Sequence, residues 1–198
     1  MTSNPDAFRW LAAVAIVAAT GVSTYHRRRA DRAGDRISAR VERWPVRILT
    51  RGFGAAAWLA LFATILAPDR MAWSTGVPPL GLRWLGAAVV AAGPLLFLWV
   101  FRHLGGNVTS TVVTRRDHTL VTSGPYRWVR HPLYTVGALF MLGMSLLLGS
   151  WLIPILAAPA MAGLMLRTPD EEAGLVARFG DDYRAYMART GRYLPRLG

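Results

Sequence analysis

The sequence predicts an all-α integral membrane protein with five transmembrane helices, the last two a tight hairpin, followed by a cytoplasmic C-terminal helix. Three observations predict this fold. Hydrophobic residues make up 53% of the 198 residues and charged residues only 17%, a balance that suits lipid better than water. The apolar residues fall into long uncharged runs. The 23 basic residues, all of them arginine, lie mostly between these runs, as positive charges do in membrane proteins.

Three apolar runs in the N-terminal half predict the first three spans. They are residues 10–25, 52–68 and 84–101. The first run could be mistaken for a signal peptide. However, its positive charge follows the run, and no small-residue cleavage site intervenes. We therefore expect an uncleaved membrane anchor.

The fourth apolar stretch is too long to be a single span. Residues 133–166 contain no charge, and as one helix they would be about 51 Å long at 1.5 Å per residue. The hydrocarbon layer is only about 30 Å thick, so the chain must turn back. Gly149, Ser150 and Pro154 lie near the middle of the stretch and favour a turn there.

The arginines predict the orientation. Nine lie in residues 26–51, five in residues 102–132 and six from residue 167 onward, whereas three lie on the other side of the predicted membrane. Basic loops favour the cytoplasmic side. We therefore expect the C-terminus in the cytoplasm and the N-terminus outside, in a bacterial inner (plasma) membrane.

Composition excludes several classes of site. A net charge of +12 would indicate a nucleic-acid partner in a soluble protein, but arginines flanking apolar runs are a topology signal, so we expect no nucleic acid. The absence of cysteine excludes disulfides and thiolate catalysis. Four histidines without H-x-x-H spacing predict no metal site.

The segment before the hairpin is polar but contains ordered signals. Gly124 and Pro125 predict a turn. Pro132 suits the first turn of the next span, where a proline loses no helical hydrogen bond. Arg130 and His131 would then lie at the membrane surface beside a helix N-terminus, which favours an anion such as a carboxylate. Alternatively, His131 only anchors the helix at the interface.

A second polar segment follows the hairpin. Thr168 is predicted as an N-cap, Pro169 as the first helical residue and Glu171 as the capping-box partner of a helix that continues to about Arg189. On this interpretation Glu171 can be a cap alone. One apolar and aromatic face of the helix is expected to fold back onto the preceding loop or the bilayer surface, and it carries Leu175, Phe179, Tyr183 and Tyr186.

Two blocks of residues flank the predicted hairpin. The first contains His118-Thr119-Leu120-Val121, Gly124, Tyr126 and Arg130-His131-Pro132-x-Tyr134. The second contains Arg167, Glu171-Glu172, Leu175, Phe179-Gly180, Tyr183, Tyr186 and Pro195. Together they resemble the isoprenylcysteine carboxyl methyltransferase family and its phospholipid methyltransferase relatives. The resemblance covers about the last hundred residues, and only the combination of motifs is specific.

The resemblance implies a cofactor and a set of site residues. It implies one methyltransferase domain over residues 1–198, with three spans in 1–101 and the cofactor-binding and catalytic half in 102–198. The implied contacts with S-adenosyl-L-methionine are His118, Thr119, Leu120, Val121, Tyr126, His131, Pro132, Leu133, Tyr134 and Glu171. The implied catalytic residues are Arg130, Arg167, Glu171 and Glu172, with Arg167 facing the acceptor.

The chemistry of these side chains agrees with that cofactor. A carboxylate, an ammonium, a sulfonium and a flat adenine require basic donors, one acid and aromatic walls. Methyl transfer needs an in-line approach and exclusion of water. A carboxylate acceptor needs no base, whereas a phenol, thiol or amine needs one, for which Glu172 or His118 is a candidate.

One departure from the family pattern concerns Arg167. Thr168 and Pro169 stand between it and the two acids. A helix that starts at Pro169 would turn Arg167 away from Glu171. The sequence therefore leaves open whether Arg167 reaches the site.

The predicted function is S-adenosylmethionine-dependent methyl transfer to a lipophilic acceptor at the cytoplasmic membrane face. The acceptor is an isoprenylcysteine-type carboxylate or another lipid-tailed carboxylate, phenol or amine that enters from the bilayer, and the other partners are membrane lipids. One alternative is an NADPH-dependent sterol-type reductase, but no nicotinamide motif is present and such enzymes have more spans. The other is a non-enzymatic membrane protein, which would not need both blocks on one membrane face.

Overall fold

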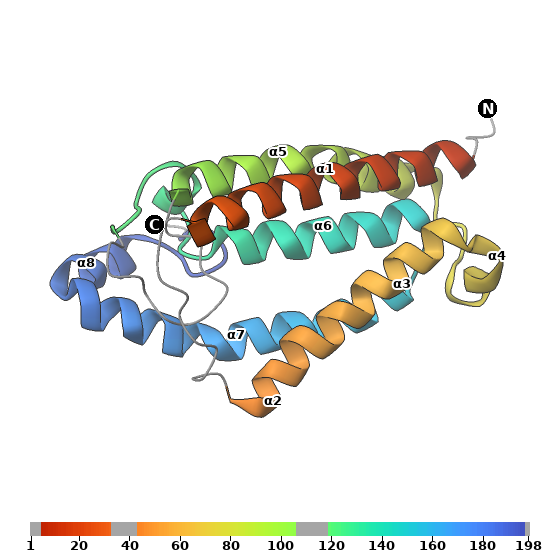
Figure 1. The fold of residues 1–198 in the computed structure, drawn as a ribbon. Helices are drawn as coiled ribbons and strands as arrows, with labels where there is room; N and C mark the ends of the chain where they lie inside the picture. Colours follow the sequence, from red (N-terminus) through yellow and green to blue (C-terminus); the bar gives the residue numbers. More distant parts are fainter. Residues whose placement is uncertain (1–4, 33–42, 106–118, 197–198) are drawn as a thin grey trace.

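The structure, a computed structural model, describes residues 5–32, 43–105 and 119–196, and every regular element within these ranges is helical (Figure 1). For this part of the chain the all-α prediction is confirmed. In chain order the elements are α1 (Pro5–Arg32), α2 (Trp44–Arg47), the π-helix η1 (Ile48–Phe53), α3 (Gly54–Leu66), α4 (Pro68–Met71), the 3-10 helix η2 (Ala72–Ser74), α5 (Leu80–Leu104), the 3-10 helix η4 (Gly124–Arg127), α6 (Pro132–Leu148), α7 (Leu152–Phe179) and α8 (Asp181–Arg189).

Four helical stretches are long and apolar enough to cross a membrane. They are Asp6–Arg29, Trp44–Leu66, Leu80–Leu104 and Leu152–Phe179. Large apolar side chains on their outer surfaces are exposed, as lipid-facing side chains are. The chain is therefore an integral membrane protein. The remaining predicted span, the first of the hairpin, corresponds to α6, which is apolar but has 17 residues, or about 25 Å at 1.5 Å per residue.

The helices form two layers that meet at one end of the molecule. Helices α1, α5 and α6 pack together, while η1 and α3 pack against α7. In Figure 1 the layers converge near α4 and diverge towards α8. The largest cluster of buried apolar side chains lies where they converge and draws on both layers, with Phe8, Leu61, Val90, Met144 and Ile153 among its members. The core therefore joins the layers at one end and leaves them apart at the other.

Close packing of α5 against α6 depends on a glycine. A Cβ atom on Gly86 would lie 2.6 Å from the backbone nitrogen of Leu147 and 2.8 Å from the carbonyl oxygen of Gly143. Such distances are far inside van der Waals contact, so only a residue without a side chain permits this approach. Small residues serve the same purpose at many helix interfaces in membranes.

The turn between α6 and α7 lies where the sequence predicts it. Gly149 ends α6 in the left-handed conformation, with φ of 71°, which glycine adopts at no steric cost. The turn is held to the loop before α5, because the Gly76 amide donates to the Gly149 carbonyl at 2.9 Å and the Trp151 amide donates to the Ser74 carbonyl at 3.1 Å. Pro154, also assigned to the turn from sequence, lies instead in the first turn of α7.

The predicted helix start at Thr168 and Pro169 is wrong. Helix α7 runs without interruption from Leu152 to Phe179 and ends at Gly180, where φ is 55°. Thr168 is a buried residue inside the helix, and its hydroxyl donates to the Leu164 carbonyl at 2.9 Å. Because Glu171 is also inside the helix, it is not a capping residue. A proline within a helix costs about 3 kcal/mol, which the packing of α7 outweighs.

Candidate active site

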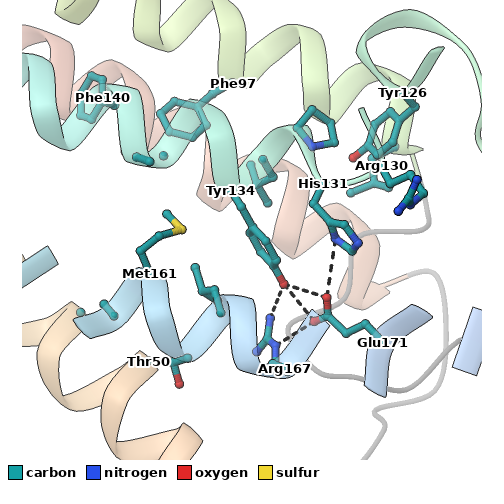
Figure 2. Close-up of a pocket in the computed structure, with 18 of the residues that line it drawn as sticks. Thr50, Phe97, Tyr126, Arg130, His131, Tyr134, Phe140, Met161, Arg167 and Glu171 are labelled. Atoms are coloured by element: carbon teal, nitrogen blue, oxygen red, sulfur yellow. Dashed lines mark hydrogen bonds and ion pairs between the residues drawn. The ribbon is translucent and has the colours of Figure 1, made fainter. Parts of the chain in front are cut away.

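A cavity of about 750 Å³ lies between the two layers, with walls formed by α3, α5, α6, α7, α8 and residues 119–121. Its lining changes character along its length (Figure 2). On one side the wall is apolar and includes Phe97, Phe140 and Met161. On the other side Tyr134 and His131 from the start of α6 face the ionic side chains of α7. The cavity can therefore hold a molecule that has both a charged part and an apolar part.

The side chains predicted from sequence gather around this cavity. Of the residues assigned to the cofactor, those in the described part of the chain all line it: Thr119, Leu120, Val121, Tyr126, His131, Pro132, Leu133, Tyr134 and Glu171. Arg130 and Arg167 line it as well, whereas Glu172 does not. His118 lies outside the described residues.

The polar end of the cavity is built around one carboxylate. The Tyr134 hydroxyl lies 2.9 and 3.0 Å from the two oxygens of Glu171, to which it donates. Arg167 donates to the Tyr134 hydroxyl at 2.7 Å, and its Nε lies 2.7 Å from Glu171 Oε1 (Figure 2). Both charged side chains are 15% exposed. The cavity thus presents a carboxylate, a guanidinium and a phenol within one hydrogen-bonded group.

The contact between Arg167 and Glu171 bears on a question that the sequence leaves open. A helix starting at Pro169 would have turned Arg167 away. Because α7 is continuous, the two residues are four positions apart on one helix face, the spacing at which side chains meet. Pro169 therefore does not remove Arg167 from the site.

His131 stands at the junction of both acids. It is the N-cap residue of α6, and Pro132 is the first helical residue, as predicted. Its ring stacks on that of Tyr134, with centroids 5.4 Å apart and planes 15° from parallel. His131 Nδ1 lies 3.7 Å from Glu171 Oε2, and His131 Nε2 lies 3.3 Å from Glu172 Oε1. The imidazole is therefore fixed on both edges.

Glu172 points away from the cavity into a cluster of cations. The residue is only 3% exposed. Arg130 Nε donates to its Oε1 at 2.8 Å, and Arg192 donates to its Oε2 at 2.6 Å. Arg130 also donates to the carbonyls of Met187, at 3.1 Å, and Thr190. This ionic cluster joins the start of α6 to α7, α8 and the residues after α8.

Residues 190–193, here called the C-terminal segment, run beside residues 128–131. The Gly191 amide donates to the Trp128 carbonyl at 3.1 Å, the Arg130 amide to the Gly191 carbonyl at 2.9 Å and the His131 amide to the Arg192 carbonyl at 3.0 Å. Sequence reasoning missed this segment. It is a short extended stretch of four residues, and neither helical nor strand periodicity identifies a single bridge of this kind.

Three tyrosines, Tyr126, Tyr183 and Tyr186, line the cavity where α8 packs near the first motif block. The Tyr186 hydroxyl donates to the Tyr126 carbonyl at 2.6 Å. Burial raises the pKa of Tyr186 to about 12 and holds the pKa values of Tyr126 and Tyr183 above their ordinary range. These phenols therefore stay protonated.

The apolar and aromatic face that the sequence predicted on one helix is divided between α7 and α8. All four of its members nevertheless line the cavity: Leu175, Phe179, Tyr183 and Tyr186.

The arrangement suits recognition of a zwitterionic molecule. No group of three histidine, cysteine or acidic residues able to hold a metal ion occurs within the described ranges. One partly exposed carboxylate can pair with a cationic group, while the guanidinium and the imidazole can pair with an anionic one. The aromatic and aliphatic walls can hold a flat ring or an alkyl chain.

Three comparisons with known proteins bear on this site. The model of the isoprenylcysteine carboxyl methyltransferase family matches residues 84–177. The matched region contains most of α5, all of α6 and nearly all of α7, and therefore every cavity residue that the sequence assigned to the cofactor or to catalysis. It ends before α8 and the C-terminal segment.

Two curated relatives are similar to part of the chain. The chain is 33% identical over 126 residues to cobalt-zinc-cadmium resistance protein CzcN of Cupriavidus metallidurans, covering 62% of this chain and 53% of that protein. It is 35% identical over 96 residues to protein-S-isoprenylcysteine O-methyltransferase of Schizosaccharomyces pombe, covering 47% of this chain and 41% of that enzyme. The chain thus spans about half the length of these relatives or less.

A solved structure has a similar fold. It is that of the eukaryotic intramembrane Ras methyltransferase, an isoprenylcysteine carboxyl methyltransferase, with a TM-score of 0.51 and 26% sequence identity. The likeness covers 73% of this chain and 51% of the other. It therefore extends beyond the region that the family model matches.

Proposed function

We propose that the chain is a membrane-embedded methyltransferase of the isoprenylcysteine carboxyl methyltransferase type that uses S-adenosylmethionine, a proposal supported by its similarity to that family over residues 84–177. One observation carries the proposal beyond this similarity. A single cavity joins an ionic end, with Glu171 at its centre, to an apolar wall formed by membrane helices. That combination fits a charged methyl donor and a lipophilic acceptor meeting in one space.

The residues present fit the cofactor. When bound, S-adenosylmethionine supplies a methyl group activated by a positively charged sulfur. Glu171 would pair with its ammonium group, and His131 would donate to its carboxylate, since these are the acid and a basic donor that the cavity offers. Tyr126, Tyr134 and residues 119–121 would wall in the rest. Tyr134 holds the Glu171 carboxylate in place through its hydroxyl.

Arg167 is proposed to orient the acceptor. Its guanidinium lies in the cavity between Glu171 and the apolar wall. An acceptor carboxylate would gain a charge-assisted hydrogen bond there and would need no proton acceptor. For this reason we favour a lipid-tailed carboxylate, of the isoprenylcysteine type, over a phenol or an amine. The chain's main contribution to rate would be positioning and exclusion of water.

The membrane setting completes the proposal. We propose that α6 is a fifth span, that the ionic end of the cavity lies at the cytoplasmic face, and that α8 lies on that face. The arginine distribution supports this orientation. The acceptor would enter sideways from the bilayer and the cofactor from the cytosol. Residues 1–198 would then form one domain whose second half, from residue 102, carries the chemistry.

A methyl-transfer assay tests the proposal. Purified protein in native lipid extract, supplied with S-adenosylmethionine tritiated on the methyl group, should transfer label to a product that partitions into organic solvent. Arg167→Ala should lower turnover by about a hundredfold or more while changing cofactor affinity much less, because it removes an interaction with the acceptor. Arg167→Lys, which keeps the charge without the guanidinium fork, should be intermediate. Label that never enters the organic phase would count against a lipophilic acceptor.

A further inference from the structure

The C-terminal segment contacts His131 but does not line the cavity. The Arg192 carbonyl accepts the His131 amide hydrogen at 3.0 Å. The Tyr193 ring lies 5.9 Å from the His131 ring between centroids. The Tyr193 hydroxyl donates to Thr168 at 2.8 Å, and its carbonyl accepts from Thr135 at 2.6 Å. The segment therefore ties the first turn of α6 to α7 on either side of the histidine.

Glu172 completes this connection. One of its oxygens accepts from Arg192 at 2.6 Å, and the other lies 3.3 Å from His131 Nε2 and 2.8 Å from Arg130 Nε. Both oxygens of Glu172 are thus held by short contacts with arginine side chains or with the imidazole nitrogen of His131. A carboxylate held in this way is poorly placed to accept a proton from an acceptor, and Glu172 does not line the cavity. This geometry suits a role in which Glu172 holds the His131 side chain rather than contacting a ligand itself.

We propose that the C-terminal segment belongs to the catalytic machinery, because Arg192, acting through Glu172, positions His131 for the cofactor. Arg192 and Glu172 are positioning residues, and neither is the catalytic base. Arg192 lies beyond the region matched by the family model. The inference rests on the proposed function, since it requires that His131 contacts the cofactor. Ligand-binding side chains held by a second set of charged partners are a recurrent feature of sites that need fixed geometry.

A double-mutant cycle tests the connection. The probe is S-adenosylhomocysteine, and its affinity for the purified protein in detergent is measured by calorimetry. Glu172→Gln keeps the shape of the side chain and removes its charge. It should weaken affinity about tenfold, equivalent to about 1.4 kcal/mol. In a His131→Ala background the same change should cost less than about twofold, because the group through which Glu172 acts is gone.

Arg192 gives a milder second variant. Its side chain is 41% exposed, so Arg192→Gln should fold even if Glu172→Gln does not. It should weaken affinity by about threefold, and Arg192→Lys should restore part of the loss because the charge returns. Asp181→Asn is the matched control, since its partner Arg184 and its own carboxylate lie at the exposed start of α8. It should bind the probe as wild type does.

The outcomes separate positioning from stability. If Glu172→Gln or Arg192→Gln lowers the unfolding temperature but the folded protein binds the probe normally, the cluster is only structural and the inference is overturned. Equal losses of affinity with and without His131 would overturn it as well. Should wild-type protein itself bind no probe, the proposed function fails and this inference fails with it. Coupled losses, with partial rescue by Arg192→Lys, would support it.

Discussion

Two neighbouring glutamates of α7 have the same charge and opposite surroundings. Successive residues on a helix point about 100° apart. Glu171 therefore faces the cavity with Tyr134 and Arg167, while Glu172 is buried against Arg130 and Arg192. The motif resemblance implies a cofactor contact for Glu171 and a catalytic role for both acids, but it gives no reason for Glu172 to face away from the cavity. That distinction depends on helix phase, and the sequence placed the helix start incorrectly.

The first residue-scale prediction concerns Glu171. Glu171→Gln retains the shape of the side chain but not the charge that would pair with the cofactor's ammonium group. Loss of a charge-assisted hydrogen bond of about 1.5–3 kcal/mol should weaken binding of S-adenosylhomocysteine about tenfold or more. Asp170→Asn is the control, because Asp170 is the exposed acid next in the chain. Calorimetry that finds equal affinity for the two variants would remove Glu171 from the cofactor site.

At the scale of elements, local signals and packing disagree at α7. Thr168, Pro169 and Glu171 match the capping pattern of a helix start. The structure keeps the helix continuous, because Thr168 is buried and hydrogen-bonded within it and to Tyr193. The long apolar spans and the Gly149 turn were predictable, since charge-free length and turn residues act locally. The continuation of α7 was not, since it depends on contacts with distant residues.

A matched pair of glycines tests the packing of α5. Gly86→Ala places a methyl group against the backbone of α6, and such overpacking costs about 1–3 kcal/mol. It should lower the unfolding temperature in detergent. Gly81→Ala, in the first turn of the same helix, meets no atom within 4 Å and should leave the temperature unchanged or slightly higher. The packing described for α5 and α6 would be in error if Gly86→Ala were as stable as Gly81→Ala.

At the scale of the whole molecule, two of the three arginines away from the basic loops have structural roles. Arg9 donates to the Ile65 carbonyl at 2.7 Å, near the end of α3, and Arg83 donates to the Leu147 carbonyl at 3.4 Å, near the end of α6. Cations are favourable at helix C-termini.

The sequence predicts the spans and their charge bias, but it does not predict the two diverging layers, because their arrangement depends on contacts between distant helices.

Topology reporters test the number of spans. With five spans, a reporter fused after Gly198 should be cytoplasmic and one placed before Met1 should be outside. If α6, at about 25 Å, does not cross the bilayer, the two termini lie on the same side. A periplasmic C-terminus would contradict both the five-span count and the cytoplasmic placement of the cavity's ionic end. The arginine bias predicts the first result.

Cofactor choice by the wild-type protein tests the central claim most directly. The measurement is calorimetric titration of the purified protein, in parallel, with S-adenosylhomocysteine and with NADPH, accompanied by thermal unfolding at rising ligand concentration. We predict saturable binding of S-adenosylhomocysteine and an unfolding temperature that rises with its concentration, with no response to NADPH. Binding of NADPH, with no S-adenosylhomocysteine bound up to millimolar concentration, would contradict the methyltransferase account and favour a membrane reductase.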